Sequence, residues 1–390
     1  MRGVTCRTED GGYPVADAVM RGGILLACHH GLDEAQIRRA GDLYLACERV
    51  IACWGMGITQ HQNSVATIQM IVNLLLMRGN IGRPGAGPCP VRGHSNVQGD
   101  RTMGIWEHPP KALLQNLERV FGFTPPQEPG LGTVDTIRAM LDGQVKVFFA
   151  LGGNFAAATP DTVQTWKALR QCDLTVHVTT KLNRSHIVHG RDALILPCLG
   201  RTEMDMQAGG LQGVTVEDSM SMVHISMGIN PPAAPDLLSE PAIVARLAAA
   251  TLGARSQTPW LWLVEDYSRI RDKIADVFVD FADFNTRVSV PGGFRLRNTA
   301  SERVWITGPG KAVFKTHAVP VDTPLHQARQ RKGDAKVFAL MTTRSHDQYN
   351  TTIYGDDDRY RGVFGQRRVV FANEHDIRDL GMKAGDLIDF

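Results

Sequence analysis

The chain has 390 residues, of which 43% are hydrophobic and 21% are charged, and its formal net charge is +2. This balance is ordinary for a globular enzyme of roughly two or three domains. It excludes the basic field of a nucleic-acid-binding protein and an acidic interaction tail. The sequence shows no signal peptide and no apolar run near the roughly 18 residues that span a bilayer, so we expect a cytoplasmic protein without a membrane span.

The cysteines are scattered along the chain. There are seven, and none stands in a C-x-x-C pair, so the sequence predicts no metal ligands of the zinc or iron–sulfur type. An odd number of cysteines suggests free thiols, most of them buried. The seven are Cys6, Cys28, Cys47, Cys53, Cys89, Cys172 and Cys198.

The first third of the chain alternates predicted helices and strands. Residues 1–30 have poor hydrophobic periodicity and are interpreted as a leader. Apolar spacing predicts a helix over 33–49 and a strand over 50–54. A polar glycine loop follows, and then a helix over 64–78 that ends at Gly79. Strand, glycine loop and helix in this order are typical of an α/β domain that binds a ligand at the carboxyl end of a parallel strand.

The same order returns downstream. Residues 146–151 form a predicted strand, 152–154 a tight glycine loop and 160–169 a helix. Two further strands are predicted at 174–178 and 193–197. This half of the chain therefore predicts a doubly wound α/β sheet. We expect the helix over 64–78 and the strands at 50–54, 146–151 and 193–197 to be buried.

The last part of the chain is less regular, and it ends inside a predicted β domain, which suggests that this domain is incomplete. The elements expected there are a methionine-rich loop over 209–235, helices over 239–282, a glycine- and proline-rich linker over 291–332, strands at 337–341 and 368–372, a helix at 374–380 and a last strand over 385–390.

Residues 90–100 are the most informative segment. They contain an arginine, a histidine and amide side chains among glycines, which suits a convergent site for an anionic or polar ligand. Arg92 and His94 stand two apart, so in an extended loop they point the same way. Arg92 can then hold an anionic oxygen with two hydrogen bonds while His94 moves a proton. The alternative is that Arg92 pairs with Asp100 or Glu107 and only holds the loop.

Residues 342–352 form a second polar segment. These eleven residues include no aliphatic side chain, and they follow a predicted strand. Their hydroxyl and amide groups are short neutral donors and acceptors, which suit a guanine, a pterin and phosphate. The alternative is a solvated loop.

Other sites fit the sequence less well. The glycines of residues 82–87 have the wrong order for a dinucleotide-binding loop, and residues 308–311 lack the serine or threonine that follows a P-loop lysine. Residues 93–97 miss the nucleophile elbow of serine hydrolases because Val97 stands in place of the last glycine.

Both polar segments, with the loops at 55–60, 152–154 and 179–186, resemble molybdopterin-dependent oxidoreductases of the formate dehydrogenase alpha-subunit type, most closely the YdeP-like branch. The resemblance covers residues 31–390, and residues 356–362 look specific to that branch. It implies doubly wound α/β domains of the formate dehydrogenase/DMSO reductase type, followed by an incomplete C-terminal double-psi β-barrel. It also implies two-electron chemistry at a molybdenum bis-molybdopterin guanine dinucleotide centre, a small anionic substrate such as formate, and an electron-transfer partner subunit.

The resemblance implies roles for individual residues. The catalytic residues would be Arg92, which orients the substrate beside the metal, and His94. The residues implied to bind the cofactor are Gly55, Met56, Gly57, Thr59, Gln60, Asn96, Gly152, Gly153, Asn154, Thr179, Thr180, His186, Glu203, Thr343, Arg344, Ser345, His346, Gln348, Asn350 and Thr351. The implied domains are a leader over 1–30, the end of one α/β cofactor-binding domain over 31–94, a second over 95–225, a helical segment and linker over 226–332, and the start of the β-barrel over 333–390.

Members of this family are longer, and their first domain can carry a 4Fe–4S cluster and a cysteine, selenocysteine or serine ligand to molybdenum. This sequence holds no such motif, so we expect an incomplete chain whose flanking DNA encodes the missing parts. Two alternatives remain: a non-catalytic fragment of such an enzyme and, less favoured, a generic Rossmann-like enzyme that binds nicotinamide and no molybdenum. The molybdenum content of the purified protein separates these possibilities.

Overall fold

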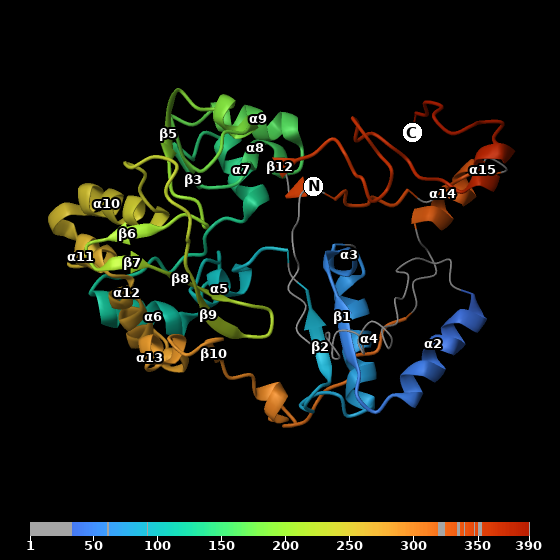
Figure 1. Ribbon diagram of the computed structural model, residues 1–390, viewed down its shortest axis with the longest axis horizontal. Coiled ribbons are helices and arrows are strands. Elements are labelled where there is room, and N and C mark those ends of the chain that lie inside the picture. Colours follow the sequence, from blue (N-terminus) through green and yellow to red (C-terminus); the bar gives the residue numbers. More distant parts are fainter. Residues whose placement is uncertain are drawn as a thin grey trace, which may run out of the picture. The chain divides into compact units, whose positions relative to one another are not determined.

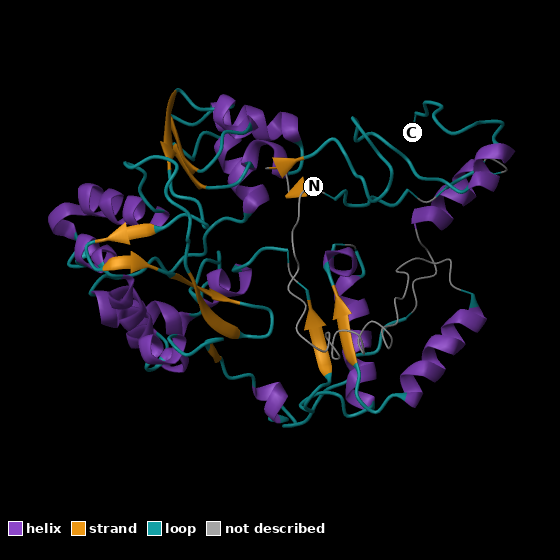
Figure 2. Ribbon diagram, viewed as in Figure 1, coloured by secondary structure: helices purple, strands orange, loops and turns teal. Residues whose placement is uncertain are grey.

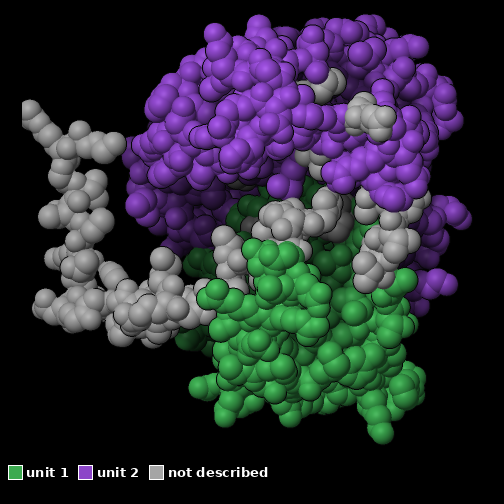
Figure 3. Space-filling model, turned by 90° about the vertical axis from the view of Figure 1, so that its right-hand side faces the viewer, with its two compact units in different colours: residues 1–104, 215–225, 279–320 green, residues 105–214, 226–278, 321–390 purple. Residues whose placement is uncertain are grey.

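The computed structural model describes residues 33–60, 62–91, 93–318, 324–333, 336–338, 340–346, 348–349 and 353–389 (Figure 1). The chain divides into two units, each built from three separate stretches. Unit 1 comprises residues 1–104, 215–225 and 279–320, and unit 2 comprises residues 105–214, 226–278 and 321–390 (Figure 3). Helices and short strands alternate along both units, which confirms the mixed α/β class (Figure 2).

A two-stranded parallel sheet organises the first stretch of unit 1. β1 (Ile51–Trp54) pairs with β2 (Gly87–Pro90), and the chain between them forms α3 (Met56–Thr59) and α4 (Ser64–Met77). Before β1 lies α2 (Glu34–Ala46). The first amides of a helix have no hydrogen-bond partner within it. In α2 the Asp33 carboxylate accepts the Gln36 amide hydrogen and so caps the start of the helix.

The last stretch of unit 1 contains an aromatic cluster. Phe281, Phe284 and Phe294 are buried, with ring centroids 4.9 Å apart for the first pair and 5.5 Å apart for the second. Phe294 belongs to β10, an edge strand of a small sheet with the order β10–β9–β8. The remaining elements of unit 1, some of which reach into unit 2, are α5 (Val97–Thr102), β8 (Val214–Glu217), β9 (Met222–Ser226), η3 (Val279–Phe281), α13 (Phe284–Val288), β10 (Phe294–Arg295) and η4 (Thr299–Glu302).

Unit 2 contains a three-stranded parallel sheet. Its strands are β3 (Val147–Leu151), β4 (Leu174–Thr179) and β5 (Asp192–Pro197), in chain order across the sheet. The other elements of unit 2 are α6 (Lys111–Phe121), α7 (Thr133–Leu141), α8 (Phe155–Ala158), α9 (Thr162–Arg170), η1 (Arg184–Ile187), β6 (Asp205–Gln207), β7 (Gly210–Gln212), α10 (Glu240–Leu252), η2 (Gly253–Arg255), α11 (Trp260–Glu265), α12 (Tyr267–Val277), α14 (Pro324–Lys332), β11 (Gln348–Tyr349), β12 (Ile353–Tyr354) and α15 (Glu374–Asp379).

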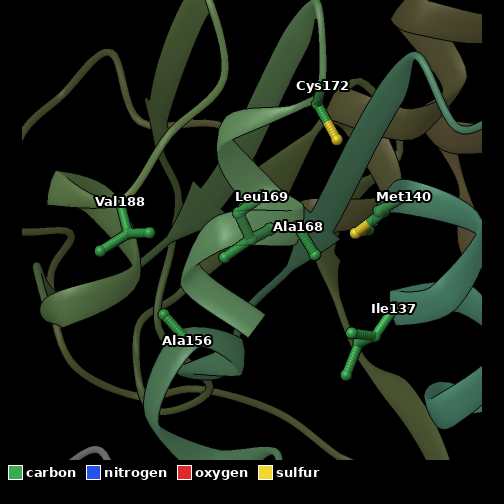
Figure 4. Close-up of a cluster of buried hydrophobic side chains, with 7 residues drawn as sticks. All are labelled: Ile137, Met140, Ala156, Ala168, Leu169, Cys172 and Val188. Atoms are coloured by element: carbon green, nitrogen blue, oxygen red, sulfur yellow. The ribbon is translucent and has the colours of Figure 1, made fainter. Parts of the chain in front are cut away.

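The main core of unit 2 lies where α7, α8 and α9 meet. Met140 of α7, Ala156 of α8 and Leu169 of α9 are fully buried there, and Phe148 of β3 packs against the same cluster (Figure 4). A smaller cluster joins Val178 of β4 to α10. Removing apolar surface from water in these clusters is the main force that holds the helices against the sheet.

The expected burial of several elements was wrong. Val65 of α4 is 67% exposed, Ile51 of β1 is 55% exposed, and Leu151 and Leu194 of β3 and β5 are 50% and 51% exposed. The β1–β2 sheet has two strands and the β3–β4–β5 sheet has three. Sheets this narrow leave edge positions and parts of their faces without a covering layer.

Other expectations for the later part of the chain also differ from the structure. The loop expected over 209–235 contains β7, β8 and β9, whereas the helices expected over 239–282 and 374–380 are present as α10 to α12 and α15. No strand forms at the described residues of 337–341, 368–372 and 385–390. The last part of the chain instead contains β11 and β12, which have two residues each.

Candidate functional site

Two of the predicted loops leave the same edge of the β1–β2 sheet. The strands are parallel and Trp54 is paired with Pro90, so the residues that follow each strand begin side by side. The Val91 amide donates to the Trp54 carbonyl oxygen at 2.6 Å. A methyl group on Gly93 would lie 3.1 Å from the Met56 sulfur, so the two loops are in contact.

The residues predicted to act in these two loops are mostly accessible. Gly55 is half-buried at the start of α3, and the exposed residues on or near this edge are Met56, Gly57, Thr59, Gln60 and His94. Arg92 lies outside the described residues, so its catalytic role stays a prediction.

The Asn96 side chain is engaged within unit 1. Its Oδ1 accepts the Glu217 amide hydrogen at 2.9 Å, and its Nδ2 donates to Asp100 Oδ1 at 3.3 Å. The Glu217 carboxylate in turn accepts the Thr102 hydroxyl hydrogen at 2.6 Å. Asn96 therefore ties α5 to β8, and its predicted contact with a cofactor stays a prediction.

The β3–β4–β5 sheet gathers a second set of predicted loops at its carboxyl edge. Gly152 follows β3, Thr179 ends β4, and the turn that contains Glu203 follows β5. Gly152 and Gly153 have φ angles of 72° and 78°, which favour glycine. Among the described residues, beyond their chain neighbours, none has an atom within 4 Å of a methyl group built on either glycine.

Asn183 and Ser185 hold this glycine loop in place. The Asn183 side-chain amide donates to the Gly153 carbonyl oxygen at 2.7 Å. The Ser185 hydroxyl accepts the Ala156 amide hydrogen and donates to Asn154 Oδ1, each at 3.0 Å. Neither Asn183 nor Ser185 was a predicted site residue, although an asparagine that begins a short helix is a recognisable capping signal.

His186 belongs to a buried histidine pair. Its ring lies 4.9 Å from that of His177, and the two residues are 8% and 4% exposed. Its Nδ1 accepts the Asn183 amide hydrogen at 2.9 Å, whereas the Nε2 atoms of both histidines have no hydrogen-bond partner among the described residues. Burial, with a smaller contribution from His186, lowers the pKa of His177 and keeps its ring neutral. His186 is thus packed inside the unit, while Thr180 is exposed at the same edge.

Glu203 acts on the backbone of its own unit. Its carboxylate accepts hydrogen bonds from the amides of Gly200 and Ala233, each at 2.5 Å. The backbone of Gly228 packs so closely against Glu203 that a methyl group on Gly228 would overlap the Glu203 carbonyl group. Glu203 therefore fixes the loop after β5, and a direct contact with a cofactor stays a prediction.

The polar segment near β11 is organised by Asp358. The Asp358 side chain is 6% exposed, and it accepts hydrogen bonds from the His346 amide at 3.1 Å, His346 Nδ1 at 2.9 Å and the Arg361 guanidinium at 2.7 Å. The Arg344 carbonyl oxygen also accepts from Arg361 at 2.8 Å. Hydrogen bonds through Asp358 and Arg361 therefore hold residues 344–346 against the turn that begins at residue 356.

Neighbouring side chains complete this region. The Ser345 hydroxyl donates to Gln348 Oε1 at 2.6 Å, and Arg367 donates to the same oxygen. Thr343, Ser345, Asp358 and Arg361 line a cavity of about 80 Å³. The structure thus brings together the predicted residues from Thr343 to Gln348, whereas Asn350 and Thr351 lie outside the described residues.

We expect the stability contributed by Asp358 to disappear in acid. Burial raises the pKa of its carboxyl, but the hydrogen bonds from Arg361 and from the amide and ring of His346 outweigh it and hold the pKa well below the usual range. A depressed folded-state pKa stabilises the fold fully above the ordinary aspartate value of about 3.9 and progressively less as the pH falls below it.

Urea unfolding of wild type and Asp358→Asn between pH 7 and pH 3 checks this expectation. The difference in midpoint should be largest near neutral pH and shrink as the pH falls. Asp142→Asn, at an exposed turn of the same unit, is the control and should show little difference at any pH. A difference for Asp358→Asn that grows in acid would contradict the assignment.

Every helix formed by the described residues is too short or too polar to cross a membrane.

The sequence of the chain is similar to those of known oxidoreductases. The family model for molybdopterin oxidoreductases matches residues 26–188. The chain is 53% identical over 360 residues to an uncharacterized oxidoreductase of Mycobacterium bovis and 51% identical over 359 residues to protein YdeP of Escherichia coli K12, each match covering 92% of this chain. A putative formate dehydrogenase of Bacillus subtilis, YrhE, is 30% identical over 164 residues, which are 40% of this chain and 17% of that protein.

The matches to the oxidoreductase of M. bovis and to YdeP cover 45% and 46% of those proteins, so the chain spans about half the length of these relatives. The family model covers the loops after β1, β2, β3 and β4, and the long matches extend the similarity over most of the chain. The chain therefore contains a molybdopterin oxidoreductase domain over residues 26–188 and is a homologue of the YdeP proteins over most of its length.

Proposed function

We propose that this chain forms part of the alpha subunit of a formate dehydrogenase-like molybdopterin oxidoreductase. Its reaction is a two-electron oxidation or reduction at a molybdenum bis-molybdopterin guanine dinucleotide centre. Formate is the first small anionic substrate to test, and a second subunit exchanges the electrons. In this proposal residues 333–390 supply the start of the double-psi β-barrel that binds the dinucleotide.

The observation that carries the proposal is the open carboxyl edge of the β3–β4–β5 sheet. Gly152 and Gly153 form a turn of positive φ there, and a methyl group on either would meet no atom of the described residues beyond the adjoining ones. The exposed side chains of Thr180 and Lys181 follow β4 at the same edge. A hydroxyl donor, a cation and a glycine turn fit the phosphate and pterin groups of such a cofactor.

Each part of the chain has a defined task in this proposal. The bound molybdenum–pterin group supplies the two-electron step. Arg92 binds the anionic substrate through two parallel hydrogen bonds, and His94 accepts or donates a proton at a ring nitrogen. The glycine loop after β3 holds the cofactor through its backbone and leaves the space into which the cofactor fits.

A pair of glycine variants tests this use of the open edge. In Gly153→Ala the added methyl group would occupy space assigned to the cofactor, so the affinity for the cofactor should fall by about tenfold or more. Gly143→Ala is the matched control, because Gly143 has a φ of 70°, lies before β3, and would place its methyl group 3.9 Å from the Lys146 ammonium nitrogen. Both variants should lose about 1–2 kcal/mol of folding free energy through the strain of a left-handed alanine.

Molybdenum and pterin per chain, measured together with urea unfolding, distinguish the outcomes. The proposal expects molybdenum in wild type and Gly143→Ala, and a clear loss in Gly153→Ala at equal stability. A wild-type protein without molybdenum after expression with a molybdate supply would overturn the proposal, as would equal molybdenum in both variants.

A further inference from the structure

Two cysteines face each other across the β1–β2 sheet. The register of the parallel strands pairs Cys53 with Cys89 directly. Neighbouring strands lie about 4.8 Å apart, which falls within the usual separation of the Cα atoms in a disulfide.

The pair is accessible and has no part in the proposed reaction. Cys53 is exposed and Cys89 is half-buried, and both are free thiols. Burial, and after it the neighbouring Cys89 thiol, raise the pKa of the Cys53 thiol, which favours its protonated form at neutral pH. Because the thiolate is the attacking form, exchange at this pair should accelerate as the pH rises above neutral.

We propose that Cys53 and Cys89 form a reversible disulfide-forming site that reacts with small-molecule disulfides such as oxidised glutathione. The thiolate of one cysteine attacks the glutathione disulfide, which releases one glutathione and leaves a mixed disulfide. The second cysteine then attacks that mixed disulfide and releases the other glutathione. The two cysteines lose two electrons and two protons in total, and one oxidised glutathione becomes two reduced molecules.

The other described cysteines lack this geometry. Cys47 is exposed but is not paired with a cysteine in any strand register, and Cys172 and Cys198 are buried. The disulfide would link β1 to β2, which are connected in the sequence through α3 and α4. Cys53 comes two residues before Gly55, and Cys89 comes three residues before Arg92. The reaction of these two thiols requires no bound cofactor.

Peptide mapping of the full chain tests the site without any variant. Trypsin should release residues 50–78 and 79–92, each with one cysteine, because the Arg83–Pro84 bond resists cleavage. After treatment with oxidised glutathione at pH 8.5, these two peptides should appear joined, with a mass about 2 Da below their sum, and a reductant should separate them. At pH 6.5 the joined peptide should form more slowly.

Single variants sharpen the result. Cys53→Ser and Cys89→Ser should each keep one glutathione as a stable mixed disulfide on the remaining cysteine. The control Cys47→Ser should still form the joined peptide at the wild-type rate. Wild-type protein that yields no joined peptide, or that joins either cysteine to a different one, would overturn the inference whether or not the variants fold.

Discussion

An Arg92→Lys variant of the cofactor-loaded protein should lose about one to two orders of magnitude in kcat/KM while its molybdenum content stays near that of wild type. Lysine keeps the positive charge, but it lacks the planar pair of donors that a carboxylate accepts. The loss of one charge-assisted hydrogen bond, worth roughly 1.5–3 kcal/mol, sets the size of the effect. Formate-dependent reduction of an artificial acceptor and molybdenum per chain should be measured on the same preparations.

Arg83→Lys is the matched control for this experiment. Arg83 precedes β2 and makes an exposed ion pair with Glu48, of the kind that contributes little to stability. The control should keep both turnover and molybdenum. If Arg92→Lys loses both in equal measure, Arg92 holds the loop or the cofactor; if it keeps full turnover, the catalytic assignment is wrong.

A Gly228→Ala variant should lose about 3 kcal/mol of folding free energy, because its new methyl group would overlap the carbonyl group of Glu203. The conflict is between two backbone segments, and neither can move without breaking hydrogen bonds. The Ile229 amide donates to the Thr202 carbonyl oxygen at 2.9 Å, and the Met204 amide donates to the Asn230 carbonyl oxygen at 2.8 Å. Urea unfolding measures the loss.

Gly132→Ala provides the comparison for Gly228→Ala. Gly132 lies in the same unit, and a methyl group on it would meet no atom of the described residues beyond its neighbours. Its change should alter stability by about 0.5 kcal/mol or less. Equal unfolding midpoints for the two variants would mean that the turn after β5 is not packed against Gly228 in solution.

Most of the strands that begin these loops could be predicted from local sequence, but β2 could not. The predicted strands at 50–54, 146–151, 174–178 and 193–197 correspond to β1, β3, β4 and β5, because a short apolar run is a local signal, whereas the glycine and prolines of β2 give no such signal. The positions of the loops at strand ends follow from that, since parallel strands share a carboxyl edge.

The partners of individual side chains could not be predicted in the same way. Asn96 accepts a hydrogen bond from the Glu217 amide, 121 positions away, and nothing near Asn96 in the sequence indicates that contact. Asn183 and Ser185 act on a loop 30 and 31 positions earlier. The predictions of burial failed for a related reason. The layer that covers a strand comes from distant residues, and hydrophobic periodicity indicates only which faces of an element are apolar.

The interleaved construction of the two units has a consequence for the order of folding. Unit 1 needs residues 279–320, which are synthesised after most of unit 2. The Asn73 side chain of α4, for example, donates to the Lys315 carbonyl oxygen, 242 positions later. The β3–β4–β5 sheet, in contrast, forms within one continuous stretch of the chain. It can therefore assemble on the ribosome before Lys315, which α4 contacts, has been synthesised. Because contacts of large sequence separation form slowly, completion of unit 1 should be the late step of folding.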